Sequence, residues 1–408
     1  MKKIALFLAL LIVAGTFGTV TAFAEEKIDT NALDMNYYSR YKDKGYSISV
    51  YNWGEYISDG ADGTLNVNAA FEEMTGIKVV YSNYDTNESL YAKLKTGGTS
   101  YDVIIPSDYM ISRLIADGLL QKMDFGNIPN LKYIEDRYLN QSYDPENAYS
   151  VPYTWGVLGI IYNITMLDDP SVIKTWGALW SEAYMDNILM IGNSKDAFGI
   201  AFKLLDYPIN AESTEQVDKA VELLKKQKNV IQAYVADEIF DKMIGGEAAM
   251  APYYNGDAVT MIADNPDLAF SIPEEGSNIF TDCMCIPATS TKRELSEMYI
   301  NFMLEPEVGL ANTEAIGYST PNSAVYELLD DEVKNDPVAY PSEEDLARCE
   351  YFNYVGSALS AYIDEKWAEV LTADERYSAM IMPMFLGACV AGIIALNVFR
   401  ATHKKREG

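Results

Sequence analysis

Aromatic and acidic side chains gather where the predicted strands end and the chain turns toward the next helix. Ligands of parallel α/β sheets bind outside the carboxyl ends of the strands, so these residues are the first candidates for chemistry. The segment YNWGEYI, which ends a predicted strand at residue 53, is the first example. The strand-end set comprises Trp53, Tyr56, Ser107, Tyr109, Asn193, Asp196, Tyr253, Tyr254, Asp257, Phe280, Asp282 and Tyr318.

The composition of the strand-end set favours a positively charged ligand with an apolar middle. Aromatic faces attract ammonium groups by about 0.5–2 kcal/mol each, and carboxylates form charge-assisted hydrogen bonds with them. Aromatic walls also cover methylene groups, at about 0.8 kcal/mol per CH₂. The nearest basic residue is Lys195, so a phosphate or carboxylate ligand would be left with helix N-termini for its positive charge.

The composition also excludes several kinds of site. The single histidine, His403, stands near the end of the chain, which removes Ser-His-Asp and Cys-His centres and His-ligated metals. The cysteines show no metal-binding spacing, and we predict no metal and no cofactor. A formal net charge of −29 disfavours nucleic acid as a partner. A reaction that uses two carboxylates stays open.

The cysteines are predicted to be mainly structural. Cys283 and Cys285 are two residues apart in a strand-like run, so their side chains share one face and cannot easily bond to each other. We predict that both are buried thiols, and a disulfide with Cys349 is left open.

Strands that alternate with helices must position the strand-end residues. YSISVYNW (46–53) precedes a helix predicted over 61–75, in which apolar residues recur at helical spacing. Two further strand–helix pairs follow, the first of them closed by Gly97, and they indicate parallel α/β units. The segment 151–163 breaks this rhythm and is predicted to cross to a second α/β set. About 350 residues suffice for two lobes.

The two ends of the chain carry targeting signals. Residues 1–24 have the basic start, apolar run and A-x-A site of a signal peptide, with an uncleaved anchor as the alternative. Residues 25–45 are predicted to be a spacer. Residues 380–399 carry no charge and precede a basic tail at 400–408, which predicts a single transmembrane helix with a cytoplasmic tail. A buried C-terminal core helix is the alternative.

Several segments resemble motifs of one family in the order in which that family has them. They are YNWGEYI, DVIIPSDYMI, VPYTWGVLGIIYN, IGYSTPN and EVKNDPVAYPSEEDL. The chain resembles the periplasmic spermidine/putrescine-binding proteins of polyamine ABC transporters over roughly residues 46–372. The resemblance implies a non-enzymatic, two-lobed α/β protein with a type II periplasmic-binding-protein fold that closes on its ligand around a hinge. The implied lobes are 46–156 with 276–322, and 157–275 with 323–372.

The resemblance also implies ligand contacts for residues that match the family's motifs. Asp282 matches the aspartate that holds an ammonium group, and Tyr318 matches a tyrosine beside it. The other matching positions on the same lobe are Trp53, Tyr56, Ser107 and Tyr109.

Five positions depart from the family's pattern. A second-lobe carboxylate is replaced by Asn193, and a nearby glutamate by the shorter Asp196. Two tryptophan positions hold Tyr254 and Phe280, and a glutamine position holds Phe352. The loss of one carboxylate and one polar group weakens the case for a central secondary amine, so it favours a diamine such as putrescine.

Each candidate has a structural alternative that the structure can test. Trp53 could be plain core, Ser107 could only cap the next helix, and Asp196 could be a solvated residue in a helix's first turn. Tyr254 could be ordinary packing. Asp282 is harder to explain in this way, because a buried carboxylate requires a partner.

We therefore expect a membrane-anchored, extracytoplasmic substrate-binding protein at the bacterial cell membrane. It would capture a polyamine, putrescine or spermidine, in an aromatic and acidic cleft between the lobes and deliver it to an ABC permease. One alternative is a membrane-tethered sensor of a small organic cation, although a tail of about nine residues is too short for a signalling domain. An exported hydrolase with two catalytic carboxylates is the other.

Overall fold

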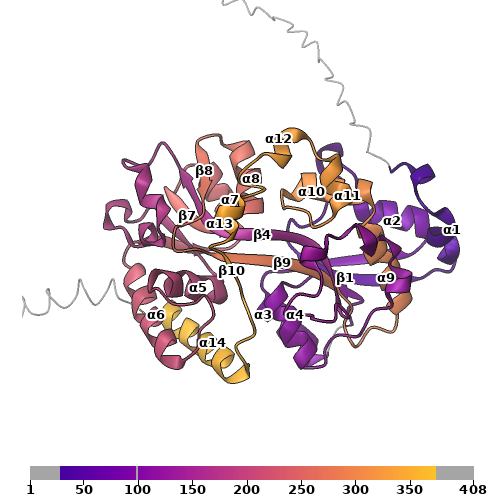
Figure 1. The fold of residues 1–408 in the computed structure, drawn as a ribbon, viewed down its shortest axis with the longest axis horizontal. Helices are drawn as coiled ribbons and strands as arrows, with labels where there is room; N and C mark the ends of the chain where they lie inside the picture. The colour runs from indigo at the N-terminus through magenta and orange to yellow at the C-terminus, as the bar shows by residue number, and fades with distance from the viewer. Residues whose placement is uncertain (1–27, 98–99, 374–408) are drawn as a thin grey trace, which may run out of the picture.

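The fold is organised around one mixed β-sheet that extends through both halves of the molecule (Figure 1). The structure is a computed structural model, and it describes residues 28–97 and 100–373. Along its main path the sheet has the strand order β2-β1-β3-β9-β4-β7-β5-β6, with β10 paired to β9 and β8 paired to β4. The strands are β1 (Ser47–Trp53), β2 (Lys78–Tyr84), β3 (Val103–Ile104), β4 (Ser150–Asn163), β5 (Ile188–Ile191), β6 (Ile231–Val235), β7 (Met250–Tyr254), β8 (Leu268–Ser271), β9 (Asn278–Cys285) and β10 (Glu350–Tyr351).

Two long antiparallel strands, β4 and β9, join the two halves of this sheet. The first part of β4 pairs with β9 through Val157, and from Leu158 onward β4 pairs with β7. β4 is buried at nearly every position, including the polar residues Ser150, Thr154 and Asn163, so both of its faces are covered. The predicted two-lobed α/β fold is confirmed in this arrangement, while the exact lobe boundaries remain a prediction.

Helices flank both ends of the sheet in Figure 1. Those packed around β1, β2 and β3 lie in one half, and those packed around β5, β6 and β7 lie in the other. The helices are α1 (Met35–Tyr38), α2 (Val67–Thr75), α3 (Asn87–Thr96), α4 (Asp108–Ala116), α5 (Ser194–Leu204), α6 (Thr214–Gln227), α7 (Glu238–Ile244), α8 (Asn255–Asp264), α9 (Arg293–Met303), α10 (Pro306–Ile316), α11 (Ser323–Leu328), α12 (Asp331–Lys334), α13 (Glu343–Leu346) and α14 (Ser357–Thr372).

Local capping explains where the early helices begin and end. The helix predicted from residue 61 begins later, at Val67, because the side chain of Asn66 accepts a hydrogen bond from the backbone N–H of Ala69. Helix α3 ends as predicted at Gly97, which adopts φ +64°.

The predicted spacer contains packed structure in its described part. Residues 28–45 form short helices, and Tyr38 is 1% exposed. Its hydroxyl donates to Glu305 and accepts from Asn301 at 2.7 Å. Helices this short leave no hydrophobic period in the sequence, so pattern alone did not reveal them.

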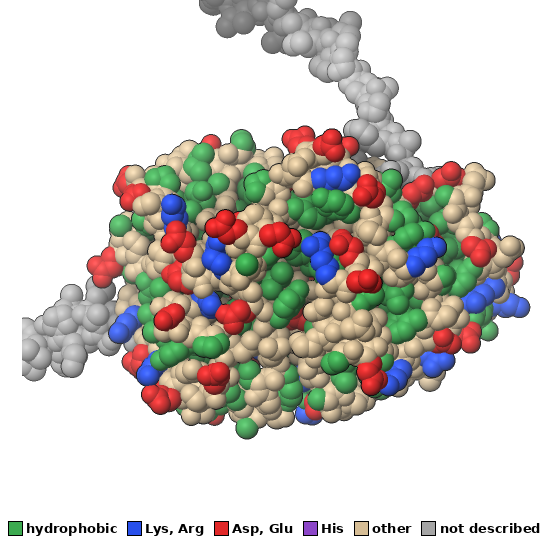
Figure 2. Space-filling view, viewed as in Figure 1, with side chains coloured by type: hydrophobic (Ala, Val, Ile, Leu, Met, Phe, Trp, Pro, Cys, Tyr) green, Lys and Arg blue, Asp and Glu red, His purple; other side chains and the backbone are tan. Residues whose placement is uncertain are grey.

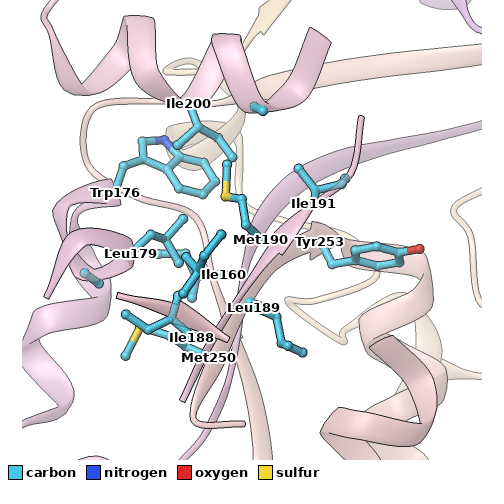
Figure 3. Packing of buried hydrophobic residues seen from close by; sticks show 14 of the residues in the cluster. Ile160, Trp176, Leu179, Ile188, Leu189, Met190, Ile191, Ile200, Met250 and Tyr253 are labelled. Atoms are coloured by element: carbon cyan, nitrogen blue, oxygen red, sulfur yellow. The ribbon is translucent and has the colours of Figure 1, made fainter. Parts of the chain in front are cut away.

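Each half of the molecule has its own hydrophobic core. In the half around β5, Trp176 lies close to Met190 and Ile200, while Met250 lies beside Ile188 (Figure 3). The other half is built around rings such as Phe71, Tyr299 and Phe302. A third cluster packs Tyr51, Leu90 and Ile111 of the first half against Ile209 and Phe352 of the other.

The cysteines behave as the sequence predicts. Cys283 and Cys285 are both buried and free, and Cys349 is free and partly buried. The prediction of two buried thiols is confirmed, and no disulfide links Cys349 to them.

The surface is mixed in character. On the face shown in Figure 2, hydrophobic side chains are interspersed with acidic, basic and polar ones. The large hydrophobic side chains that are exposed come from separate parts of the chain: Tyr46, Val80, Ile164, Met185, Leu328, Val333 and Leu371. Single exposed hydrophobic residues are normal for a globular protein.

The predicted fold class requires one correction, because it included a transmembrane helix over residues 380–399. Within residues 28–97 and 100–373, no helix is both long and apolar enough to cross a membrane. Even α14 has 16 residues, which rise about 24 Å against a hydrocarbon core of about 30 Å. The predicted span, the tail at 400–408 and the signal peptide at 1–24 lie outside the described residues. The fold that the structure supports is the two-lobed α/β part alone.

The entry into β9 depends on a glycine. Gly276 adopts φ +84°, and a Cβ there would stand 2.0 Å from the carbonyl oxygen of Arg348, which lies just before β10. We expect Gly276→Ala to lower the free energy of unfolding by about 2–3 kcal/mol, because strain and a backbone clash act together. Urea unfolding followed by circular dichroism measures this.

Gly246 provides the matched control for that substitution. It also has a positive φ, +69°, but a Cβ there would meet nothing within 4 Å. Gly246→Ala should therefore cost only about 1 kcal/mol. Equal losses for the two variants would contradict the close approach at Gly276.

Candidate functional site

A cavity of about 350 Å³ lies where the strand ends of the two halves meet. Its walls come from the carboxyl ends of β1, β2, β5, β6 and β7, from one face of β9, and from the segment after β10. All of the residues assigned to the site from the sequence line this one cavity: Trp53, Tyr56, Ser107, Tyr109, Asn193, Asp196, Tyr254, Phe280, Asp282, Tyr318 and Phe352.

Asp282 is a buried carboxyl with one oxygen satisfied and one free. Successive side chains of a strand alternate between faces, so Phe280 and Asp282 of β9 both reach the cavity. Asp282 is 4% exposed, and its Oδ2 accepts a hydrogen bond of 2.7 Å from the hydroxyl of Tyr56. Its Oδ1 has no partner among the described residues. Burial raises the pKa of Asp282 to about 6, although hydroxyl donors from Ser107 and Tyr56 oppose the rise.

Asp196 repeats this arrangement on another wall. It lies in the first turn of α5 and is 3% exposed, so it is not a solvated residue. Its Oδ2 accepts a hydrogen bond of 2.7 Å from the hydroxyl of Tyr254, while its Oδ1 has no partner in the described chain. Burial raises the pKa of Asp196 to about 7. The cavity therefore holds two carboxyls that each have an unused acceptor.

Aromatic rings line the cavity together with these carboxyls. The ring centroid of Tyr318 lies 5.0 Å from that of Tyr56, and the centroid of Phe280 lies 5.4 Å from that of Tyr254. Trp53 is only partly buried, its ring lies 4.6 Å from that of Tyr84, and its Nε1 has no hydrogen-bond partner among the described residues. Trp53 therefore belongs to the cavity wall more than to the core.

Two glycines let the rings lie directly against the backbone. A Cβ at Gly156 would stand 2.8 Å from the ring of Phe280, and one at Gly256 would stand 2.3 Å from the ring of Tyr318. Real Cβ atoms do not approach rings so closely, so any other residue here would displace the cavity wall.

The polar candidates next to helices differ in role. Ser107 occupies the N-cap position of α4, but its side chain makes no capping hydrogen bond there, and its hydroxyl instead accepts from the side-chain amide of Asn87 at 3.1 Å. Asn193 does cap α5, because its Oδ1 accepts from the backbone N–H of Lys195 at 2.9 Å. The hydroxyl of Tyr109 donates to Glu88 at 3.0 Å.

Several lining residues were not assigned to the site from the sequence. Asp257 follows β7 and was among the strand-end candidates, and its Oδ2 accepts a hydrogen bond of 3.0 Å from Tyr318. Burial raises the pKa of Asp257 to about 7. Asn278 is 4% exposed, and its Oδ1 has no hydrogen-bond partner within the described part of the chain. Its spacing of two from Phe280 and four from Asp282 was the signal that could have identified it.

The cavity is strongly acidic. Among the described residues that line it, none is lysine, arginine or histidine. Its carboxyl-bearing residues are Glu55, Asp85, Asp108, Asp196, Asp237, Glu238, Asp257 and Asp282. Within the described chain, no three His, Cys, Asp or Glu side chains are grouped so that they could hold a metal ion. This field attracts an organic cation and repels anions.

The raised carboxyl pKa values predict how stability depends on pH. The folded pKa values of Asp282 and Asp196 lie near 6 and 7, whereas unfolded aspartate titrates near 3.9. The folded state then holds protons that the unfolded state has released, so stability falls as pH rises from about 4 through 7. Between pH 5.5 and 8 the free energy of unfolding should fall, and these two carboxyls should account for on the order of 3 kcal/mol of that fall. The double variant Asp196→Asn/Asp282→Asn should lack this part of the pH dependence. Urea unfolding without ligand at both pH values measures it.

Asp267, an exposed carboxyl outside the cavity, supplies the control. Asp267→Asn should keep the pH dependence of the original protein. If the double variant kept it as well, the burial of Asp196 and Asp282 could not be the cause.

Comparisons with known proteins place this geometry in a family. Residues 66–341 match the family described as bacterial extracellular solute-binding protein. The chain is 34% identical over 317 residues to the spermidine/putrescine-binding periplasmic protein of Salmonella typhimurium, covering 78% of this chain and 89% of that one. Against the protein of the same name from Escherichia coli it is 33% identical over 332 residues, covering 81% and 93%.

A solved structure extends the likeness to three dimensions. A spermidine/putrescine ABC transporter protein from Listeria monocytogenes superposes with a TM-score of 0.76 at 36% identity, over 80% of this chain and 99% of that one. The matched family and these relatives are solute-binding transport proteins and not enzymes, so the hydrolase alternative is set aside. The chain belongs to the bacterial extracellular solute-binding protein family.

Proposed function

We propose that this protein is an extracytoplasmic substrate-binding protein that captures a polyamine, putrescine or spermidine, and delivers it to an ABC permease. The observation that carries the proposal is the pair of buried carboxyls, Asp196 and Asp282, each with one unpartnered oxygen in the same cavity. These relatives are named as spermidine/putrescine-binding proteins, and this supports the choice of polyamines as the ligand class.

The chemistry of a polyamine complements these walls. An ammonium group beside Asp282 Oδ1 and another beside Asp196 Oδ1 would supply the charge that each buried carboxylate lacks. The methylene chain between them would lie against the rings of Tyr56, Tyr254 and Phe280, which bury its apolar surface. The tyrosine hydroxyls on Oδ2 hold each carboxylate in place before the ligand arrives.

Closure of the two halves around the ligand explains how binding could be signalled to a permease. A Cβ at Gly54, after β1, would lie only 3.3 Å from Asp237 Oδ2, after β6, so segments of the two halves approach closely over the cavity. Opening would separate them about β4 and β9, and closure would rebuild one continuous surface. A permease that recognises this surface would receive loaded protein preferentially.

The role of Asp282 can be tested by titration calorimetry on the full-length protein. Putrescine and spermidine should bind, and Asp282→Asn should weaken putrescine binding by about 100-fold, because an ammonium loses its charged partner. Asp267→Asn should bind as the original protein does. If the original protein bound neither amine at millimolar concentration, polyamine capture would be ruled out.

A substitution at Trp53 distinguishes a side chain that contacts the ligand from one that belongs to the hydrophobic core. Trp53→Ala should weaken putrescine binding about 10- to 100-fold through lost cation–π and methylene contacts. Because Trp53 is only partly buried, its loss should change the free energy of unfolding by about 1 kcal/mol or less. Calorimetry and urea unfolding on the same samples measure the two effects.

Trp180 is a suitable comparison because it is also partly buried and lies outside the cavity, where its Nε1 donates to the carbonyl of Leu223 at 2.9 Å. Trp180→Ala should reduce stability and leave putrescine affinity unchanged. Collapse of the fold in Trp53→Ala with normal binding by the residual folded protein would assign Trp53 to the core.

A further inference from the structure

One cation of the protein lies beside the acidic cavity. Lys195 stands in the first turn of α5, between Asn193 and Asp196. Its Nζ lies 4.6 Å from the ring centroid of Tyr109 and 4.9 Å from that of Phe352. Both rings line the cavity, and no other lysine or arginine of the described chain lies over a cavity-lining ring at such a distance.

The side chain of Lys195 extends from α5 and contacts two other parts of the fold. Tyr109 belongs to α4 and Phe352 follows β10, and both helices α4 and α5 lie below β9 in the view of Figure 1. The Nζ of Lys195 also donates to the backbone carbonyl of Asn353 at 3.1 Å. The ammonium is therefore held in place by contacts from α4 and from the segment after β10.

The charge of Lys195 is kept by its surroundings. Burial lowers its pKa to about 8, while the carboxylates of Glu88, Asp108 and Asp196 oppose that fall. The side chain is thus mostly protonated at neutral pH. It carries the same chemical group, a primary ammonium, that a polyamine carries at its ends, and it holds this group over two rings of the cavity wall.

A ligand ammonium directed toward Tyr109 and Phe352 would meet this lysine. The two rings offer the faces on which an ammonium binds, and Lys195 already lies over both of them. A second positive charge beside it would be repelled, because like charges interact strongly where water is scarce. The unpartnered oxygens of Asp196 and Asp282 lie in the same cavity and remain available.

We propose that Lys195 is a specificity-determining residue: its ammonium lies over the Tyr109 and Phe352 rings beside the cavity, repels a further ligand ammonium there, and so favours a diamine over a triamine. This inference rests on the proposed polyamine function and narrows it. Two carboxyls with free oxygens match the two ammonium groups of putrescine, whereas a third amine would meet Lys195. Discrimination by repulsion of the wrong ligand is a common route to specificity.

The test compares two ligands in two variants of the full-length protein. Lys195→Met keeps the length of the side chain without its charge, and Lys195→Arg keeps the charge. Titration calorimetry gives the ratio of the spermidine Kd to the putrescine Kd. We expect this ratio to fall about tenfold in Lys195→Met and to stay within about twofold of the original value in Lys195→Arg.

Lys219→Met provides the control, since Lys219 is an exposed lysine of α6 paired with Glu215. It should leave the ratio unchanged. A ratio unchanged in Lys195→Met, or a greater loss of spermidine than of putrescine affinity, would overturn the inference while the polyamine function stands. An original protein that binds neither amine would overturn both.

Discussion

A carboxyl group buried in a protein must find partners for its oxygens, and this requirement organises the site. Asp196 and Asp282 are almost fully buried, and each receives one hydrogen bond from a tyrosine hydroxyl at 2.7 Å. The remaining oxygen of each has no partner in the described chain. Desolvation therefore raises both carboxyl pKa values toward neutrality. On the proposed account, the two ammonium groups of a dication stabilise the charged carboxylates and so offset the cost of their desolvation, and this contributes to the binding free energy.

The architecture serves this requirement in several ways. The tyrosines that hold the carboxylates come from other elements, because Tyr56 follows β1 and Tyr254 ends β7. The alternation of β9 brings Phe280 and Asp282 to the same wall. Gly256 allows the ring of Tyr318 to lie against the backbone of α8. β4 and β9 join the two halves within the main path of the sheet, and each half keeps a core of its own, while a third cluster with Ile209 and Phe352 packs between them.

Much of this could be predicted from the sequence, and the exceptions have physical reasons. Strand ends could be located from hydrophobic periodicity, so the aromatic and acidic residues that follow them were found, and the family resemblance added Phe352. Asn278 was missed because a polar residue at the start of a strand looks like any strand boundary. Asp257 was seen at a strand end but not assigned, because only its hydrogen bond from Tyr318 and its burial distinguish it. The burial of Tyr38 could not be predicted, because helices of only a few residues leave no hydrophobic periodicity in the sequence. The predicted transmembrane helix rested on an uncharged stretch and the basic tail after it, and the described chain, which does not include that stretch, contains no such helix.

The most direct test of the central claim is a crystal structure of the protein with putrescine. The account predicts that one ligand nitrogen lies about 2.7–2.9 Å from Asp282 Oδ1 and the other at a similar distance from Asp196 Oδ1. The methylene chain should lie between aromatic rings, with the Tyr56 and Tyr254 hydroxyls still on the Oδ2 atoms. Putrescine bound elsewhere, or in the cavity with both Oδ1 atoms left without a nitrogen partner, would contradict the account.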